Sequence, residues 1–330
     1  MIEEILRLKV TNFTPLLVGW YEPNIVDPIG LRPTELKGIW RWWARAFACG
    51  VLYDGGCNPL PSDLVKIVGK DLGLGYAGIN IGGKSAMPSK YIIRVNETFE
   101  PTNFKKAKFY TISLFSTESN SDKKAAAVLS FLSAIMLMGI GKRGRRGQGS
   151  LDVKKIEKEP EINGKKLVKM KVKDLVVETY KYFRKLDSIK DAQSKENPAG
   201  DNLPKFPCLS TKQDVASIHH LEARDDSRKP LEVFKNVINS FNLRKEYEWF
   251  LGMPRKGKYK ELRRPSPIIL TAHGNNIFGN GAFLTVLASA DWPNIDPEQI
   301  KRAKDAFEGC LNNYRSYGIQ DIWPPEAKII

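Results

Sequence analysis

The chain has few cysteines and histidines. Its 330 residues include three histidines and four cysteines, which are Cys49, Cys57, Cys208 and Cys310. No two cysteines form a CxxC pair and no histidine lies at ligand spacing from one, which excludes the common zinc motifs. Four scattered cysteines in a chain of this length are typical of a reducing cytosol and not of a disulfide framework. We therefore expect free thiols, no metal site and no cofactor.

Long hydrophobic runs are also missing. The longest, from Ala125 to Met138, contains Ser130 and Ser133 and is too short to span a bilayer. The first ten residues include two glutamates and lack the apolar core of a signal peptide. These absences predict a cytoplasmic protein that has no membrane partner.

Basic residues exceed acidic residues by a wide margin. Lysine and arginine number 52 against 37 aspartates and glutamates, which gives a net charge of +15. Such an excess favours binding to a polyanion, either a nucleic acid or an anionic membrane surface. A generally basic proteome or the charged surface of a thermophilic protein would produce the same excess. The length suggests two domains.

The hydrophobic pattern of the first half indicates an α+β domain. It predicts strands at 5–13, 90–95, 108–115 and 150–156, helices at 33–48 and 122–138, and an irregular glycine-rich stretch of loops and short hairpins at 54–83. Ser121 or Asp122 would cap the second helix. The order strand, helix, two strands, helix, strand is the βαββαβ order of a ferredoxin-like fold, which RNA-recognition modules also use.

The second half alternates in a similar way. The pattern predicts helices at 172–185, 230–248 and 297–314, strands at 267–272 and 282–290, and a mobile polar loop at 186–203. No sequence repeat relates the two halves. We expect an α+β fold of two tandem ferredoxin-like (RRM-like) domains with insertions, divided into 1–156 and 157–330.

The predicted helix at 33–48 combines an apolar arc with a basic stripe. At 100° per residue the arc, which we expect in the core, consists of Leu36, Ile39, Trp40, Trp43, Ala44, Ala46 and Phe47. Lys37, Arg41 and Arg45 follow one another at a spacing of four residues beside it. Such like charges repel, so either an anion lies across them or solvent and distant carboxylates compensate them. Trp42 lies outside the arc and suits either base stacking or a domain contact.

Residues 139–149 form a loop of glycine and basic residues. The sequence GIGKRGRRGQG contains five glycines and the four basic side chains Lys142, Arg143, Arg145 and Arg146. Glycine lets backbone N–H groups approach an anion, and arginine grips phosphate with two parallel hydrogen bonds. The GxGxxG match within it is not a dinucleotide fingerprint, because a helix and not a strand precedes it. We expect a flexible cationic loop that contacts nucleic acid; a merely mobile loop is the alternative.

A second basic cluster lies in the other half of the chain. Its members are Arg255, Lys256, Lys258, Lys260, Arg263 and Arg264, with Tyr259 among them. Basic residues interleaved with an aromatic ring suit single-stranded nucleic acid, and a solvated hairpin is the alternative. If both halves present their basic segments on one face, the segments form a long groove.

Several short motifs resemble a known family. They are TPLL at 14–17, LRPTELKG at 31–38 and WRWWARA at 40–46, followed by the glycine-rich loop before the last strand of the first half. Together they resemble the RAMP superfamily, the repeat-associated proteins of CRISPR effector complexes. The RWW helix, LGMP at 251–254 and RRPSP at 263–267 look most like the first-subunit family of the type III-B Cmr complex.

The resemblance implies a function as well as a fold. It implies a non-catalytic RNA-binding subunit at one end of an RNA-guided antiviral complex, with guide crRNA, target RNA and the other Cmr subunits as partners. The positions that would line its RNA groove are those of Lys37, Arg41, Arg45, Lys142, Arg143, Arg145 and Arg146. Arg32 and Trp42 adjoin them within the motifs, and the cluster at 255–264 extends the groove by charge alone.

RNA cleavage is the alternative function, because some members of the superfamily are endoribonucleases that act on guide precursor or target RNA. Metal-independent cleavage needs a general base near the 2′-OH, and His219 or His220 could supply it. Adjacent residues of a strand point to opposite faces, so these two form no dyad. The compact acidic group of Glu222, Asp225 and Asp226 is more typical of a charged surface turn than of a metal site. We therefore expect no catalytic residue.

Overall fold

The computed structural model describes residues 1–17, 30–81, 83–99, 108–193, 202–224, 228–252, 265–292 and 294–325. The first half contains β1 (Glu3–Asn12), α1 (Pro33–Asp54), α2 (Pro61–Lys66), η1 (Ile67–Asp71), β2 (Tyr76–Ile81), β3 (Lys84–Met87), β4 (Tyr91–Phe99), β5 (Lys108–Ser116), α3 (Ser121–Leu137) and β6 (Leu151–Lys158). The second half contains η2 (Leu167–Lys169), α4 (Val172–Arg184), α5 (Asp187–Gln193), β7 (Ala216–Leu221), α6 (Lys229–Asn242), η3 (Lys245–Leu251), β8 (Ile268–His273), β9 (Gly281–Leu287), α7 (Pro297–Asn312), η4 (Arg315–Tyr317) and β10 (Gln320–Trp323).

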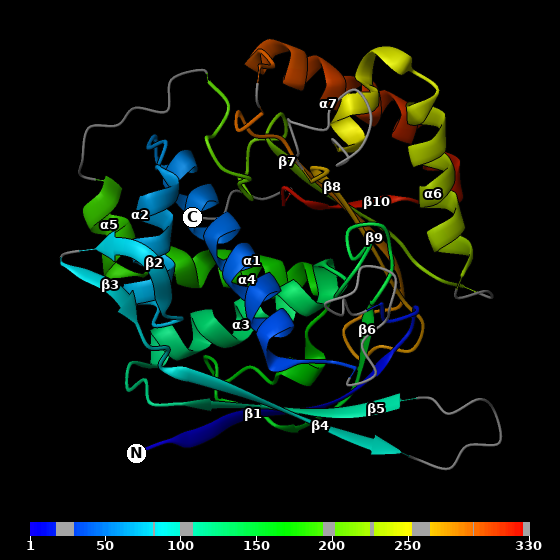
Figure 1. Ribbon diagram of the computed structural model, residues 1–330. Helices are drawn as coiled ribbons and strands as arrows, with labels where there is room; N and C mark the ends of the chain where they lie inside the picture. The colour runs from blue at the N-terminus through cyan, green and yellow to red at the C-terminus, as the bar shows by residue number, and fades with distance from the viewer. Residues whose placement is uncertain are drawn as a thin grey trace.

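The first sheet has the order β4-β5-β1-β6, and all of its strand pairs are antiparallel. Along β1 the buried residues Leu6, Leu8 and Val10 alternate with the exposed residues Arg7 and Lys9. This alternation leaves one face of the sheet to solvent and buries the other. Helices α1, α3 and α4 cover the buried face (Figure 1).

The second sheet has the order β10-β7-β9-β8 and is also antiparallel. Every residue of β8 and β9 is buried, because α3 packs on one face of this sheet and α6 and α7 cover the other. The molecule therefore has four layers: a sheet, the helices α1, α3 and α4, the second sheet, and the helices α6 and α7 (Figure 1).

Most of the predicted elements are confirmed, and several boundaries are wrong. Helix α1 continues to Asp54 rather than Ala48, because the residues from Cys49 to Tyr53 are buried. The stretch 54–83, expected to form loops and short hairpins, contains most of the hairpin β2-β3 but also α2 and the π-helical turn η1, which were not expected. The cap of α3 is neither Ser121 nor Asp122 but Asn120, whose side-chain oxygen accepts from the Lys123 N–H at 2.9 Å.

Other corrections concern the second half. The polar stretch after Lys185, expected to be a mobile loop, begins with the helix α5. Helix α6 ends at Asn242 rather than Glu248 and is followed by the 3-10 helix η3. The sequence pattern did not predict β7 or β10. Among the described residues, no helix is long and apolar enough to cross a membrane.

The C-terminal half of α1 forms the seam between the two halves. The Leu209 N–H donates to the Ala46 carbonyl at 2.9 Å, and an added Cβ on Gly50 would lie 2.1 Å from the Leu209 oxygen. Asp54 ends the helix and accepts hydrogen bonds from the hydroxyls of Tyr180, Ser210 and Thr211. Only glycine at position 50 allows the backbone of the 206–211 segment to approach this closely.

A disulfide crosses the same seam. Cys49 of α1 is bonded to Cys208 across a Cα–Cα distance of 5.1 Å, whereas Cys57 and Cys310 are free and buried. The expectation of free thiols throughout is therefore wrong for this pair. The two cysteines are 159 residues apart in sequence, and only the packing of α1 against the 206–211 segment brings them together.

We predict that Cys208→Ser lowers the free energy of unfolding by about 3 kcal/mol under oxidising conditions, because the bond closes a long loop in the unfolded chain. Urea unfolding with and without dithiothreitol measures this. The reductant should destabilise the wild type and a Cys310→Ser control but leave Cys208→Ser unchanged. Equal sensitivity of all three proteins to the reductant would contradict the bond.

Candidate nucleic-acid interface

The glycine-rich loop, residues 139–149, connects α3 to β6 and is held by its own backbone. The Ile140 N–H donates to the Gly149 carbonyl at 3.0 Å, and the Gly139 N–H donates to the Gly144 carbonyl at 3.2 Å. Two more bonds fix it to the segment after β1, from the Lys142 N–H to the Leu17 carbonyl and from the Gly149 N–H to the Pro15 carbonyl. The expectation of a flexible loop is therefore wrong. Most of its N–H groups bind protein carbonyls, which leaves the side chains to contact an anion.

The same loop extends the second sheet. The Leu270 N–H donates to the Arg145 carbonyl at 3.0 Å, and the Gly147 N–H donates to the Leu270 carbonyl at 2.8 Å, in a parallel bridge between Arg146 and Leu270. Because β8 is the edge strand of its sheet, this bridge covers part of an otherwise open edge. The loop of the first half is thereby fixed to the second half, and its arginines have a defined register.

Two glycines allow this compact backbone. Gly149 has φ +65°, and an added Cβ would lie 2.0 Å from the Ile140 oxygen. At Gly144 an added Cβ would lie 2.3 Å from the Gly139 oxygen. The glycines of the motif therefore serve the internal fold of the loop and not a close approach to an anion.

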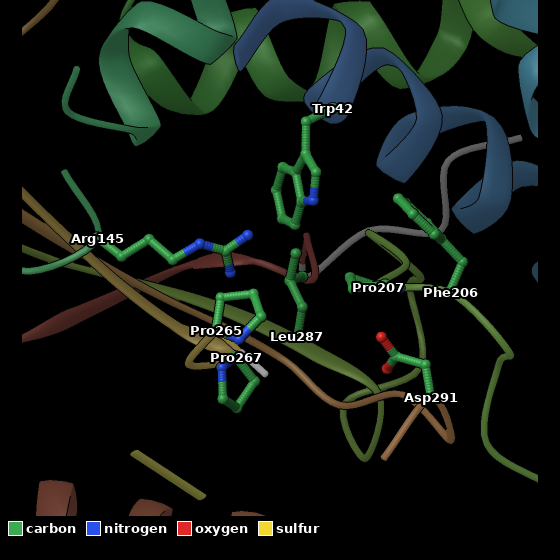
Figure 2. A pocket seen from close by; sticks show the side chains of 8 residues that line it. All are labelled: Trp42, Arg145, Phe206, Pro207, Pro265, Pro267, Leu287 and Asp291. Carbon is green, nitrogen blue, oxygen red and sulfur yellow. The ribbon is translucent and has the colours of Figure 1, made fainter. Parts of the chain in front are cut away.

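Arg145 lies beside Trp42 in a hollow between α1 and the second sheet, which we call the Trp42 slot. The guanidinium carbon is 4.6 Å from the centre of the Trp42 ring, a cation–π contact (Figure 2). The slot is shallow, with a cavity volume of about 70 Å³, and is lined by Trp42, Arg145, Phe206, Pro207, Pro265, Pro267, Leu287 and Asp291. Its walls combine a flat aromatic ring, prolines and one cation, which suits the face of a nucleobase.

The slot includes residues that the sequence alone did not indicate. Phe206 packs at 6.3 Å from the Trp42 ring, and the Arg45 guanidinium lies 5.8 Å from the centre of the Phe206 ring. Trp42 itself is half-buried at this contact between the halves, which is one of its two predicted roles. The only sequence signal for Phe206 is an aromatic residue in an otherwise polar connection.

Arginines of the loop also contact Leu251 and Ser266, which flank the second basic cluster in the sequence. Arg145 donates to the Ser266 carbonyl at 2.6 Å, and Arg146 reaches the Leu251 carbonyl at 3.5 Å. The six basic residues of that cluster, Arg255, Lys256, Lys258, Lys260, Arg263 and Arg264, lie outside the described residues.

The basic stripe of α1 is half-buried and binds protein carbonyls. Lys37 donates to the Tyr91 carbonyl at 3.0 Å, and Arg41 donates twice to the Leu74 carbonyl, at 2.7 and 3.1 Å. Burial together with the charge of Arg41 lowers the pKa of Lys37 to about 8, and burial lowers the pKa of Arg41 and Arg45. Within the described residues no carboxylate forms an ion pair with Lys37, Arg41 or Arg45. The structure brings Arg45 near the Trp42 slot, whereas Lys37 and Arg41 do not line it.

The remaining predicted residues lie at the ends of these elements. Arg32 is the half-buried N-cap residue of α1. Its charge only partly offsets the effect of burial, which raises the pKa of Glu35. Lys142 is half-buried, and Arg143 is exposed with a φ of +61°, at the tip of the loop.

His219, a candidate general base, is part of a buried ionic network. Its side chain is 3% exposed, with Nδ1 2.5 Å from Asp321 and Nε2 3.3 Å from Glu308. Burial lowers the pKa of His219, but the hydrogen bonds to Asp321 and Glu308 outweigh burial and raise it overall. The same contacts lower the pKa of each of these carboxyls to about 2 against the effect of burial. The buried His219 side chain lies between two carboxylates and joins β7, α7 and β10.

The other candidate catalytic residues that the structure describes do not come together into a catalytic site either. His220 contacts the Asn280 carbonyl at 2.9 Å, its ring stacks on Phe283, and burial lowers its pKa. Glu222 is exposed, and Asp225 and Asp226 lie outside the described residues. Across the described part of the chain, no group of three or more His, Cys, Asp or Glu residues could hold a metal ion.

Comparison with known proteins shows a family resemblance over part of the chain. The sequence model of the RAMP superfamily matches residues 10–152, which include α1 and the glycine-rich loop. The resemblance of this part of the chain to the RAMP superfamily is therefore confirmed. No curated protein matches the chain.

Solved structures share the fold of nearly the whole chain. The crystal structure of Cmr1 from Pyrococcus furiosus in its apo form is similar with a TM-score of 0.55 and 16% identity, over 98% of this chain and 99% of that one. A chain of the type III-B Cmr-beta complex bound to cognate target RNA, solved by cryo-EM, is similar with a TM-score of 0.57 and 14% identity. That match covers 94% of this chain and 100% of the other.

We predict that Gly149→Ala in the RAMP glycine-rich loop costs more than 3 kcal/mol of the free energy of unfolding, because its Cβ would overlap the Ile140 oxygen. Gly164→Ala is the matched control, since Gly164 has a φ of +67° and open space around it. In the control the free energy of unfolding should fall by about 1 kcal/mol, because alanine is strained in the left-handed backbone conformation. Equal decreases in the free energy of unfolding for Gly149→Ala and Gly164→Ala, measured in urea, would contradict the close contact between Gly149 and Ile140.

The His219 network predicts a pH dependence of stability. Because the pKa of His219 is raised above 6.5, its contribution is complete below pH 6.5 and is lost as the pH rises through the raised value. Asp321 and Glu308 contribute fully above about pH 4.5 and lose their contribution as the pH falls toward 2. The free energies of unfolding of the wild type and His219→Gln, measured in urea, should therefore differ most between about pH 5 and 6.5, and the difference should shrink as the pH rises above 6.5. A difference that does not vary with pH would contradict the charged state of His219.

Proposed function

We propose that the protein is a non-catalytic, RNA-binding subunit of a type III-B CRISPR effector complex, acting in the cytoplasm near one end of the complex. Its partners would be the guide crRNA, the target RNA and the other Cmr subunits. The observation that carries the proposal is the Arg145–Trp42 pair, a cation stacked on a ring in an open slot between the two halves.

Two further observations support RNA as the ligand. Lys37, Arg41 and Arg45 are desolvated cations without an ion-paired carboxylate among the described residues, and a phosphate backbone would compensate them. The flat ring and the guanidinium of the slot accept any base, which suits a subunit that leaves sequence choice to guide–target pairing. One structure of similar fold is a chain of a Cmr-beta complex bound to cognate target RNA.

The strand orders support a finer description of the fold. We propose that each half is a ferredoxin-like domain, with boundaries near 1–156 and 157–330. Numbered along each half, with the hairpin β2-β3 as an insertion, both sheets have the order 4-1-3-2. This is the order of a βαββαβ unit in which both helices cover one face.

The test is the affinity of a fluorescently labelled single-stranded RNA of about 40 nucleotides, measured by anisotropy across a salt series. We expect Arg145→Ala to weaken binding about tenfold, since a charge-assisted contact contributes about 1.5 kcal/mol, and to reduce the salt slope by about 0.7. Arg145→Lys should keep the slope and lose part of the affinity, because lysine keeps the charge without the planar stack. The control is Arg302→Ala, an exposed arginine on α7.

Wild-type binding that Arg145→Ala changes by less than twofold would contradict the assignment of the slot. The RNA is then run on a denaturing gel, where intact RNA is expected. Discrete shortened products would favour the endoribonuclease alternative. In that case His219→Gln and His220→Gln are the first variants to examine.

A further inference from the structure

Arg145 lines a second hollow besides the Trp42 slot. This hollow, which we call the α6 pocket, lies between α6, the end of η3, β8 and the glycine-rich loop. Its cavity volume is about 190 Å³, smaller than the roughly 300–1,000 Å³ of sites that enclose a drug-sized ligand, so it has room for one small part of a ligand such as a base. Arg145 is the one residue that lines both the α6 pocket and the Trp42 slot.

The floor of the α6 pocket is apolar. Ile268 and Leu270 are two residues apart on β8 and therefore point to the same face of the sheet. Ile238 of α6 and Leu251 of η3 complete the floor. Ile268 and Leu270 are buried in the core and fix the shape of the floor, whereas the half-buried Ile238 and Leu251 supply its exposed apolar surface.

The rim of the α6 pocket is cationic and polar. Arg146 is exposed on the loop side, and the bridge of Arg146 to Leu270 fixes its backbone at the pocket. On the α6 side Lys235 lies one turn before Asn239, so both project from the same face of the helix. Lys235 is 3.0 Å from Glu232, which lies on the exposed surface of the helix.

We propose that the α6 pocket binds a single nucleotide. The face of the base would lie on the apolar floor, the Asn239 amide would donate to and accept from its edge, and Arg146 and Lys235 would bind the phosphate. A simple anion would leave the floor unused, and an apolar ligand would leave the cations unused. The nucleotide is either one residue of a bound RNA, which rests on the proposed function, or a free mononucleotide.

Two probes separate these sources. Titration calorimetry with adenosine monophosphate measures the free nucleotide. A single-stranded RNA of about 40 nucleotides that contains 4-thiouridine, cross-linked by light and mapped by mass spectrometry, measures the RNA residue. We expect binding or cross-linking at α6 and η3, weakened about tenfold by Lys235→Ala and abolished by Ile238→Asp, which places a carboxylate on the floor. Lys229→Ala is the matched control, a lysine of the same helix that does not line the pocket.

The outcomes decide the proposal and its ligand. Cross-links lost in Ile238→Asp, without binding of adenosine monophosphate, assign the pocket to a residue of RNA. Binding of adenosine monophosphate that the variants remove assigns it to a free nucleotide, even if RNA binding itself fails. Absence of both signals at α6 and η3, or variants that behave as Lys229→Ala does, would overturn the proposal. If RNA still bound and Arg145→Ala still weakened that binding, the proposed function would remain supported.

Discussion

The pairing of the glycine-rich loop with Leu270 of β8 determines how the two halves of the protein meet. Two backbone hydrogen bonds, from Leu270 to Arg145 and from Gly147 to Leu270, add a loop of the first half to the edge of the second sheet. Backbone bonds of this kind fix both the position and the register of the added segment. Because Arg145 and Arg146 are consecutive within it, their side chains diverge. Arg145 reaches the Trp42 slot, and Arg146 reaches the end of η3.

The seam beside this pairing concentrates positive charge in partly desolvated positions. Burial lowers the pKa of Arg41 and Arg45, and backbone carbonyls rather than described carboxylates accept the hydrogen bonds of the stripe. Cations held in this way keep their capacity to attract an external anion. By contrast, the buried charges of the His219 network compensate one another and stabilise the second half. The protein thus separates structural charge from charge available to a ligand.

Local patterns in the sequence predicted much of the fold and part of the site. The apolar arc of α1 is confirmed at Leu36, Trp40, Trp43 and Phe47, and the strands with clear alternation lie close to their predicted positions. β7 and β10 were not predicted, because β7 contains two histidines whose partners lie in distant segments and β10 has only four residues. The Cys49–Cys208 bond and the contact of Phe206 with Trp42 depend on the packing of the halves, which no spacing along the chain indicates.

The rigid backbone of the glycine-rich loop could not be predicted from the sequence either. Five glycines among basic residues suggested flexibility, but Gly139, Gly144 and Gly149 permit backbone contacts too close for any other residue. The most direct test of the account is amide hydrogen exchange at Gly147 and Leu270, in the protein alone and with single-stranded RNA. The account predicts that both amides are protected to within about 1 kcal/mol of Leu284 in the central strand β9, and that RNA protects them further. Rapid exchange at Gly147 while Leu284 stays protected would contradict the pairing on which the interface depends.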